Sequence, residues 1–343
     1  MENSYYQSVV DALPHSAMVI DSMLNIICAN GHAEKLFDRD LKGVGFVRIL
    51  RQPEALRCVS DALETSEYQS CNLILRLNTS RTYLSSAGIL QTSEPEFKKR
   101  ILFTLTDISA EISAEKSRST FVANVSHELR SPLTSLMGVV ETLKGPARKD
   151  EDARDRFLDL MQGETDRMSR LVGDLLSLAK LEAKEHVPPD GEVDVTRVIR
   201  RIVAVLEEGN PDYKGRVEIK VGEDLHPIKG DRDELTEVFQ NLIENALKYS
   251  APETAVNVEI TNKTKSMRWL RVIVTDSGEG IAPEHLPRLT ERFYRVDKGR
   301  SRQMGGTGLG LAISKHILNR HRARLSIDSI VGEGTSVSVS LPI

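Results

Sequence analysis

The segment SHELRSP, residues 126–132, places a histidine beside a carboxylate in an otherwise regular helical pattern. At 100° per residue, His127 lies about 200° from the apolar Val125 and so points away from the apolar stripe of its helix. An exposed imidazole suits a nucleophile, and Glu128 can accept a hydrogen bond from one ring nitrogen, which leaves the other nitrogen free to attack. On these residues alone, a surface histidine without chemistry is the commoner case.

Pro132 lies inside the same predicted helix. Proline has no N–H, and its ring collides with the carbonyl four residues earlier, which is that of Glu128. We therefore expect the helix to bend or loosen beside His127. Small side chains continue the histidine's face and leave it uncrowded for a docking protein, namely Ser131, Thr134 and Gly138.

Polar side chains recur at helical spacing in NLIENALKYS, residues 241–250. Asn241, Asn245 and Lys248 fall within about 60° of one another on one helix face. A carboxamide oxygen can ligate Mg²⁺ and an ammonium can bind phosphate, so this row predicts a site for a metal–nucleotide. A solvated polar helix face is the common alternative.

The helix that carries this row begins at a predicted capping box, Asp231 with Glu234. Its apolar residues lie on the opposite side from the polar row and predict a buried face. They are Leu235, Val238, Phe239, Leu242, Ile243, Ala246 and Leu247.

Two glycine-containing segments follow this helix. VTDSGEGI, residues 274–281, predicts a strand that ends at Asp276, whose carboxylate can accept from an exocyclic amine such as that of adenine. Gly278 and Gly280 allow the backbone to turn closely around a base. In GGTGLGLAISK, residues 305–315, glycines precede a predicted helix whose N–H groups can bind phosphate. The three elements in this order favour a nucleotide site, although neither the P-loop nor the Rossmann pattern is present.

These residues need elements to position them, and 343 residues allow two or three domains at roughly 100–200 residues each. The first segment, about 1–106, mixes short strands with helices and predicts a small α+β domain on an antiparallel sheet. The predicted strands are Ser16–Asp21, Leu24–Ala29, Cys71–Leu77, Thr82–Leu90 and Ile101–Thr106, with helices around His32–Phe37 and Glu54–Glu64.

The second segment, 107–186, predicts two long helices. The first runs from Asp107 to Gly145 with an apolar stripe through Val125, Leu129 and Leu133, and the second from about Ala153 to Ala183. Apolar residues of the second helix fill two adjacent rows, 157/161/168/171/175/178 and 158/161/168/172/175/179. One partner helix cannot cover both rows, so we expect a symmetric dimer that forms a four-helix bundle.

The third segment, 193–343, follows the linker HVPPDGE and combines alternating strands with helices at 231–249 and 309–321, which predicts an α/β domain. A net charge of −4 argues against general nucleic-acid binding. No apolar run approaches the roughly 18 residues of a membrane span, so we expect no membrane segment in this chain and a cytoplasmic location. The three cysteines form no CxxC pair and predict buried thiols.

SHELRSPL (126–133), NLIENALKYS (241–250), DSGEGI (276–281), RFYRVD (292–297) and GTGLGLAISK (306–315) resemble the H, N, G1, F and G2 boxes of sensor histidine kinases. The resemblance extends from about residue 118 to 343. It implies a dimerisation and phosphoacceptor bundle followed by the ATP-binding α/β sandwich shared with gyrase and heat-shock chaperone ATPases. Within the family, the closest resemblance is to phosphate-regulon sensors.

The resemblance also implies site roles. His127 is the phosphoacceptor, Glu128 its base or orienting partner, and Ser131 the residue that positions water for dephosphorylation. Asn245 is the Mg²⁺ ligand, and the remaining motif positions bind ATP: Asn241, Lys248, Tyr249, Asp276, Gly278, Gly280, Arg295, Gly306, Thr307, Gly308, Leu309 and Gly310. Gly299–Met304 corresponds to a lid over the nucleotide. HRAR, residues 321–324, departs from the family's glycine pair, and we expect it to alter only a turn.

The first segment resembles a PAS domain, with weaker motifs. The implied protein is a homodimer that phosphorylates itself from ATP, passes the phosphoryl group to an aspartate of a separate response regulator and also dephosphorylates that regulator. Two alternatives stay open. A chaperone- or repair-type ATPase would hydrolyse ATP without labelling itself, and a dimeric adaptor would keep the boxes without turnover.

Overall fold

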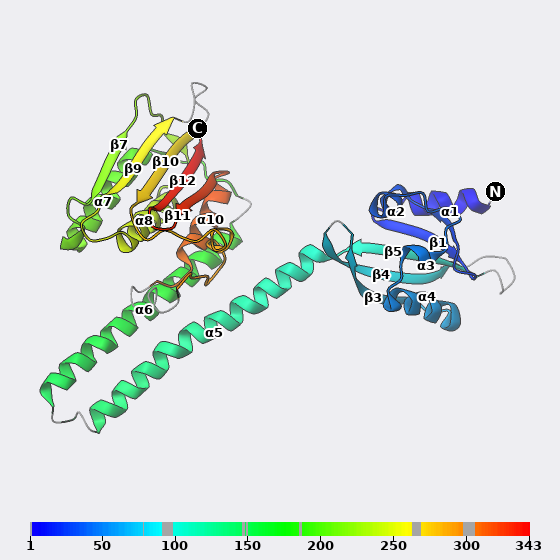
Figure 1. The fold of residues 1–343 in the computed structure, drawn as a ribbon, viewed down its shortest axis with the longest axis horizontal. Helices are drawn as coiled ribbons and strands as arrows, with labels where there is room; N and C mark the ends of the chain where they lie inside the picture. The colour runs from blue at the N-terminus through cyan, green and yellow to red at the C-terminus, as the bar shows by residue number, and fades with distance from the viewer. Residues whose placement is uncertain are drawn as a thin grey trace. The chain divides into compact units, whose positions relative to one another are not determined.

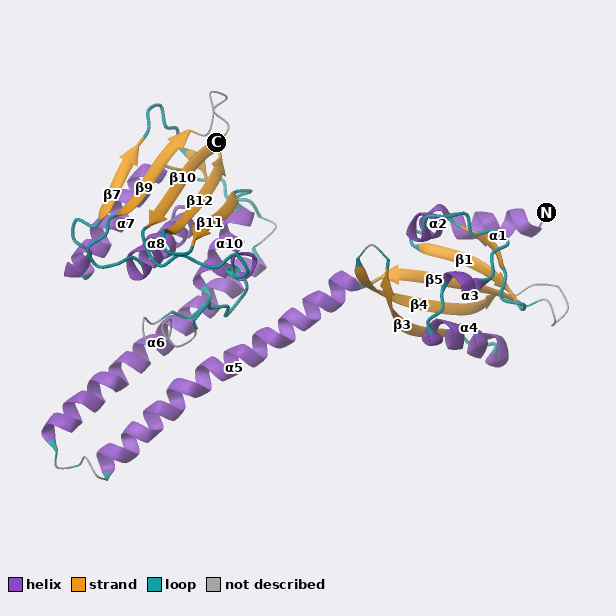
Figure 2. Cartoon of the chain, in the orientation of Figure 1, coloured by secondary structure: helices purple, strands orange, loops and turns teal. Residues whose placement is uncertain are grey.

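The computed structural model describes residues 2–77, 79–90, 99–145, 148, 150–184, 187–262, 269–297 and 306–343. The chain forms two compact units, Met1–Ala123 and Asn124–Ile343. Figure 1 shows the order of the elements and Figure 2 their type. No helix in the described ranges is long and apolar enough to cross a membrane.

The first unit contains a five-stranded antiparallel sheet in the order β2-β1-β5-β4-β3. Its elements are α1 (Glu2–Asp11), β1 (Ser16–Asp21), β2 (Ile26–Ala29), α2 (Gly31–Phe37), α3 (Phe46–Ile49), α4 (Pro53–Thr65), β3 (Gln69–Arg76), β4 (Ser80–Leu90) and β5 (Arg100–Asp107). The predicted α+β class and the five predicted strands are confirmed. Helices α1 and α3 were not predicted.

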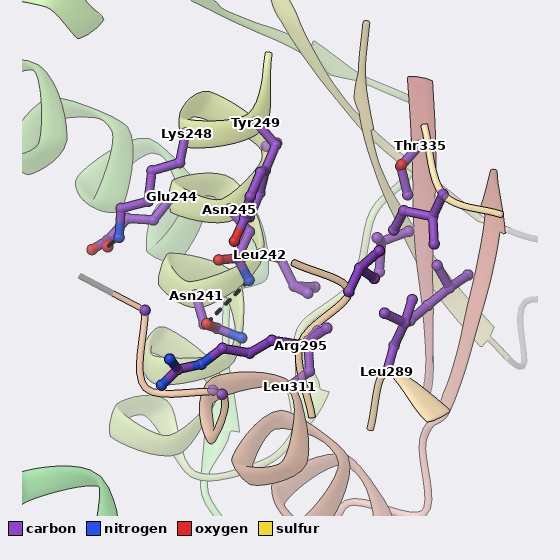
Figure 3. Close-up of a pocket in the computed structure, with 18 of the residues that line it drawn as sticks. Asn241, Leu242, Glu244, Asn245, Lys248, Tyr249, Leu289, Arg295, Leu311 and Thr335 are labelled. Carbon is purple, nitrogen blue, oxygen red and sulfur yellow. Dashed lines mark hydrogen bonds and ion pairs between the residues drawn. The ribbon is translucent and has the colours of Figure 1, made fainter. Parts of the chain in front are cut away.

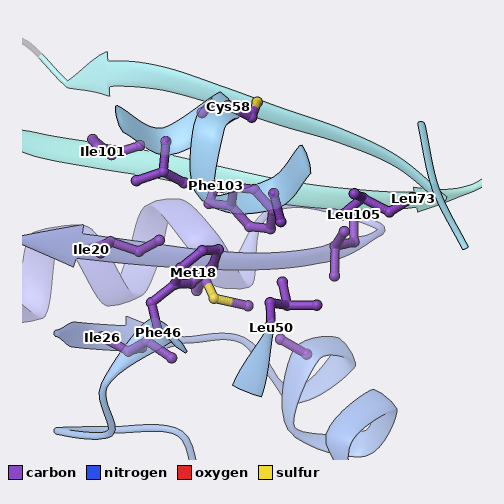
Figure 4. Close-up of a cluster of buried hydrophobic side chains, with 14 of the residues drawn as sticks. Met18, Ile20, Ile26, Phe46, Leu50, Cys58, Leu73, Ile101, Phe103 and Leu105 are labelled. Atoms are coloured by element: carbon purple, nitrogen blue, oxygen red, sulfur yellow. The ribbon is translucent and has the colours of Figure 1, made fainter. Parts of the chain in front are cut away.

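Two hydrophobic clusters hold this unit together. On one face of the sheet, strand residues pack against α2, α3 and α4, with the rings of Phe46 and Phe103 edge to face at 4.9 Å (Figure 4). On the other face, Val10 of α1 packs against Val19. Cys28 and Cys58 are buried and Cys71 is half-buried, so the prediction of buried thiols holds fully for two of the three.

The second unit begins within α5 (Ser109–Lys144), which is followed by α6 (Glu151–Ala183). These helices run antiparallel, and we call residues 124–184 the helical hairpin (Figure 1). Asp150 caps α6 by accepting a hydrogen bond from the backbone N–H of Ala153 at 2.9 Å. The helix α5 continues through Pro132 without an interruption in its helical assignment.

The rest of this unit is a layered α/β domain, called here the C-terminal domain, with the sheet order β11-β12-β10-β9-β7. Helices α7, α8 and α10 cover one face of the sheet (Figure 2). The strand pair β7–β9 is parallel, and the other pairs in this sheet are antiparallel. The elements are β6 (Glu192–Val193), α7 (Val195–Gly209), β7 (Val217–Val221), β8 (Ile228–Lys229), α8 (Arg232–Tyr249), β9 (Val256–Asn262), β10 (Trp269–Asp276), α10 (Gly310–Arg320), β11 (Arg324–Ile330) and β12 (Gly334–Pro342).

Candidate functional site

Helix α8 carries the predicted polar row. Its N-cap Asp231 accepts hydrogen bonds from the backbone N–H groups of Asp233 and Glu234 at 3.0 and 3.2 Å. All seven predicted apolar residues are buried, which fixes the rotation of the helix about its axis. The opposite side, with Asn241, Asn245 and Lys248, therefore faces a cavity.

The reciprocal half of the predicted capping box is wrong. The backbone N–H of Asp231 donates to Nε2 of His321 at 3.0 Å, and Glu234 forms an ion pair with Arg320 instead. Nδ1 of His321 lies 2.8 Å from the carbonyl of Ile317, so the ring is held as a neutral tautomer that donates at one nitrogen and accepts at the other. Burial lowers the pKa of His321.

The cavity has a volume of about 440 Å³, which suits a nucleotide-sized ligand. Figure 3 shows Lys248, Asn241 and Arg295 on one side of it and Thr335 on the other. Nearly all predicted nucleotide-binding residues line it: Asn241, Asn245, Lys248, Tyr249, Asp276, Gly280, Arg295, Gly306, Thr307, Gly308 and Gly310. The structure thus brings together residues from the end of β10, from α8 and from the start of α10.

The two asparagines are coupled. The amide nitrogen of Asn245 donates to Oδ1 of Asn241 at 3.3 Å, and the amide nitrogen of Asn241 donates to Ser314 at 3.0 Å. Asn245 therefore keeps its own Oδ1 for a ligand, and an amide oxygen is a ligand that Mg²⁺ accepts. The asparagine pair therefore fits the predicted Mg²⁺ site.

Lys248 forms an ion pair with Glu244 at 2.9 Å. Burial acts to raise the pKa of Glu244, but the hydrogen bond from Gln240 and the charge of Lys248 hold it below its ordinary value. Lys248 thus lies at the cavity as a cation fixed by a carboxylate one turn away.

Asp276 lies at the end of β10, where its Oδ1 accepts from the backbone N–H groups of Gly278 at 2.9 Å and Thr335 at 3.3 Å. Burial raises the pKa of this carboxyl. A Cβ at Gly280 would overlap the carbonyl oxygen of Ile330, and its φ of +70° also favours glycine. The close turn leaves Asp276 as a hydrogen-bond acceptor at the cavity wall.

The glycine segment 306–310 approaches α8 closely. A Cβ at Gly310 would overlap the side-chain amide of Asn241, so a larger residue there would displace this asparagine. Two predicted ATP-binding residues do not line the cavity. Leu309 is fully buried at the N-cap of α10, and Gly278 lies behind the wall against the carbonyl of Tyr249. The predicted lid, Gly299–Met304, lies outside the described residues.

His127 is exposed on α5, as predicted, and Ser131 is half-buried one turn away. Glu128 differs from the expectation that it pairs with the histidine ring. Its Oε2 instead accepts from Arg167 at 2.7 Å and lies 3.4 Å from Arg295, a cavity residue. Adjacent residues of a helix do not face each other, which explains why Glu128 finds partners other than His127.

The structure adds residues that the sequence pattern did not indicate. Arg170 and Asp174 of α6, together with Glu237 of α8, also line the cavity. Thr307 Oγ1 donates to Asp174 at 2.6 Å, and Ser177 Oγ donates to Glu237 at 2.8 Å. Burial raises the pKa of both carboxyls. A carboxylate within the apolar run LVGDLLSLA was the signal in the sequence that could have identified Asp174.

Residues 321–322 of HRAR form a turn, and His321 makes a further contact that the sequence analysis did not anticipate. His321 is buried against the start of α8, and Arg322 adopts a left-handed φ of 53°. Periodicity along one segment does not report a contact with a residue about ninety positions away, which is why the sequence pattern missed it.

Comparison with known proteins identifies two families in this chain. Residues 117–184 match the His Kinase A (phospho-acceptor) domain, and residues 230–343 match the histidine kinase-, DNA gyrase B-, and HSP90-like ATPase family. A sensor protein kinase WalK of Staphylococcus aureus is 32% identical over 345 residues, which cover 99% of this chain and 81% of that protein. WalK of Staphylococcus haemolyticus (strain JCSC1435) is 39% identical over 249 residues, 73% of this chain and 40% of that protein.

The chain spans about half the length of other curated relatives that it matches, for example 55% of WalK from S. aureus strain Newman. Among solved structures, histidine kinase ThkA in complex with response regulator protein TrrA shares the fold at a TM-score of 0.50 and 20% identity, covering 98% of this chain and 97% of that chain. The resemblance to phosphate-regulon sensors stays a prediction.

Proposed function

The chain belongs to the sensor histidine kinases of two-component systems, and we propose that it is an ATP-dependent protein-histidine kinase that phosphorylates its own His127. The observation that carries the proposal is the convergence of Asn245, Lys248 and Asp276 on one cavity of about 440 Å³. An amide oxygen can ligate Mg²⁺, an ammonium can bind phosphate and a carboxylate can accept from the adenine amine. The three side chains therefore match the separate parts of a metal–nucleotide.

Asp276 accepts the adenine amine and Tyr249 packs against the base. Asn245 would hold Mg²⁺ through its amide oxygen, oriented by its hydrogen bond to Asn241, and the ion would supply charge stabilisation to the phosphates. Lys248 and Arg295 bind the phosphate oxygens, and the segment 306–310 offers backbone N–H groups at the start of α10.

The reaction then needs an in-line attack. A ring nitrogen of His127 forms a bond to the γ-phosphorus while the bond from that phosphorus to the β–γ bridging oxygen breaks, and ADP leaves with the electron pair. Glu128 is positioned through Arg167 and Arg295, so it links the histidine's helix to the cavity. The phosphoryl group then passes to an aspartate of a separate response regulator.

A dimer is part of the proposal. In one chain, the hairpin leaves apolar side chains exposed on both helices, among them Leu133 and Met137 of α5 and Leu158, Val172 and Leu176 of α6. A second copy would cover them in a four-helix bundle. Ser131, one turn from His127, has a hydroxyl that can position water for dephosphorylation of the regulator.

The first unit is proposed to be a PAS-type input domain. Support comes from its sheet order, β2-β1-β5-β4-β3, with helices α2, α3 and α4 packed on one face. Along the chain we propose a sensor part at 1–106, a signal helix and phosphoacceptor part at 107–186 and an ATP-binding part at 193–343. Input then reaches His127 through α5, which begins directly after β5.

The test is incubation of the full chain with γ-labelled ATP and Mg²⁺, beside His127→Ala and the control His226→Ala, another exposed histidine. We expect protein-bound label that is acid-labile and base-stable in the wild type and in the control, and none in His127→Ala. ATP hydrolysis without such label would favour the chaperone-type ATPase. Absence of both binding and turnover would favour the adaptor.

A further inference from the structure

The nucleotide cavity is bordered on one side by helix α6 of the hairpin. Arg170 and Asp174, one turn apart on α6, both line it. Hydrogen bonds hold α6 there, among them those from Thr307 to Asp174 at 2.6 Å and from Ser177 to Glu237 at 2.8 Å. Helix α6, which carries Arg170, is therefore held beside the cavity.

Among the described residues, three basic side chains line this cavity: Arg170, Lys248 and Arg295. Lys248 is paired with Glu244 at 2.9 Å, and Arg295 lies 3.4 Å from Glu128. Arg170 differs, because its Nε donates to the backbone carbonyl of Asp166 at 3.4 Å and no carboxylate in the described ranges lies within ion-pair distance of it. Its two terminal NH₂ groups are therefore available to an anion.

The location of Arg170 indicates which part of the nucleotide it would meet. The charge of Arg170 acts on Asp174 and on Glu244, the ion-pair partner of Lys248, so its guanidinium lies near the Lys248 side of the cavity. That side also holds Asn241 and Arg295 (Figure 3). The hairpin carries the acceptor His127, so the phosphate nearest the hairpin is the one to be transferred.

We infer that Arg170 is a further nucleotide-binding residue, supplied by the hairpin, that binds the terminal phosphate of ATP. A guanidinium suits this task because it presents several N–H donors in one plane to phosphate oxygens. The inference rests on the proposed kinase function and deepens it. Arg170 reaches the phosphate only while the hairpin contacts the C-terminal domain, so this contact and phosphoryl transfer are coupled.

The experiment compares the full chain with Arg170→Ala, Arg170→Lys and the control Arg156→Ala, an exposed arginine earlier on the same helix. Dissociation constants are measured for Mg–ATP and Mg–ADP, together with the single-turnover rate of His127 labelling. We expect Arg170→Ala to weaken ATP binding about tenfold and to leave ADP binding unchanged, since one charge-assisted contact is lost. The labelling rate falls in parallel, and Arg170→Lys recovers part of both losses.

An equal loss of ATP and ADP affinity would overturn the inference, because it would mean that Arg170 only maintains the structure. Unchanged affinity for both nucleotides would overturn it too. The binding measurements do not depend on His127 labelling. If the wild-type chain never labels His127, the kinase proposal is refuted. The phosphate contact still stands in that case if Arg170→Ala lowers the affinity for ATP but not for ADP.

Discussion

Helices α8 and α6 show the same kind of apolar periodicity in the sequence but differ in how one chain covers it. Every predicted apolar residue of α8 is buried, including Phe239 at 0% exposure. On α6, Leu171 and Leu178 of one row are buried and the other residues of that row are half-buried, whereas Leu158 and Val172 of the neighbouring row are 49% and 45% exposed. The C-terminal domain therefore completes its core within one chain, and the hairpin requires a second surface.

The largest effect should come from the completed core. Phe239→Ala should cost about 3–5 kcal/mol of unfolding free energy, because it removes a fully buried ring and leaves a cavity. Trp269, the single tryptophan of the chain, lies on β10 of the same domain, so its fluorescence in urea reports this loss selectively. Phe157→Ala, at a half-buried position on α6, is the control and should leave the Trp269 transition in place.

The hairpin should respond differently, through association. Leu133→Asp places a charge on a side chain that is 52% exposed in one chain and proposed to be covered in the dimer. We expect the dimer dissociation constant to rise tenfold or more, because each bundle contains two copies of the change. Sedimentation measures this shift, and the Trp269 transition should stay where it was.

The matched control is Val205→Asp on α7, also exposed but outside the hairpin. It should leave dimerisation unchanged. If both variants dissociate equally, the proposed bundle surface is wrong. If neither does, the exposed rows of the hairpin are not the dimer interface.

The sequence predicted well whatever depends on spacing within one segment. The buried face of α8, the polar row behind it and the exposure of His127 all follow from 100° per residue. Contacts between distant segments were not predictable this way. Thr307 and Asp174 are far apart in sequence and bonded at 2.6 Å, and a single apolar run gives no information on which other segment will reach it.

Glu128 shows the same limit at the site itself. Its neighbour in sequence suggested a pair with His127, but the hairpin supplies Arg167 at 2.7 Å from another helix. Likewise, helix α1 has no strong apolar periodicity, and packing of Tyr6 and Val10 on the sheet stabilises it. Tertiary contacts determine both the partner of Glu128 and the formation of α1.

A smaller effect is expected where the two regions meet at the cavity. Asp174→Asn removes a negative charge beside the proposed phosphate site, while the amide oxygen can still accept from Thr307. ATP should therefore bind about fivefold more tightly, as loss of roughly 1 kcal/mol of repulsion would give. Titration with a non-hydrolysable ATP analogue measures the change. Weaker binding would show instead that Asp174 is needed to orient Arg170.

The smallest effect concerns Glu237, which accepts from Ser177 across the same contact. Burial raises the pKa of Glu237, so its ionised form is disfavoured in the folded protein, and the wild type loses stability as pH rises through that raised pKa. Glu237→Gln keeps an acceptor for Ser177 without the charge. We expect its melting temperature near neutral pH to exceed the wild-type value by about 1–3 °C.

This difference in melting temperature should close on acidification, as the wild-type carboxyl takes up its proton. Thermal unfolding at several pH values measures the difference, with Glu208→Gln, at an exposed position, as the control. A difference that does not depend on pH would mean that the packing of the glutamine, and not the loss of charge, changes the stability.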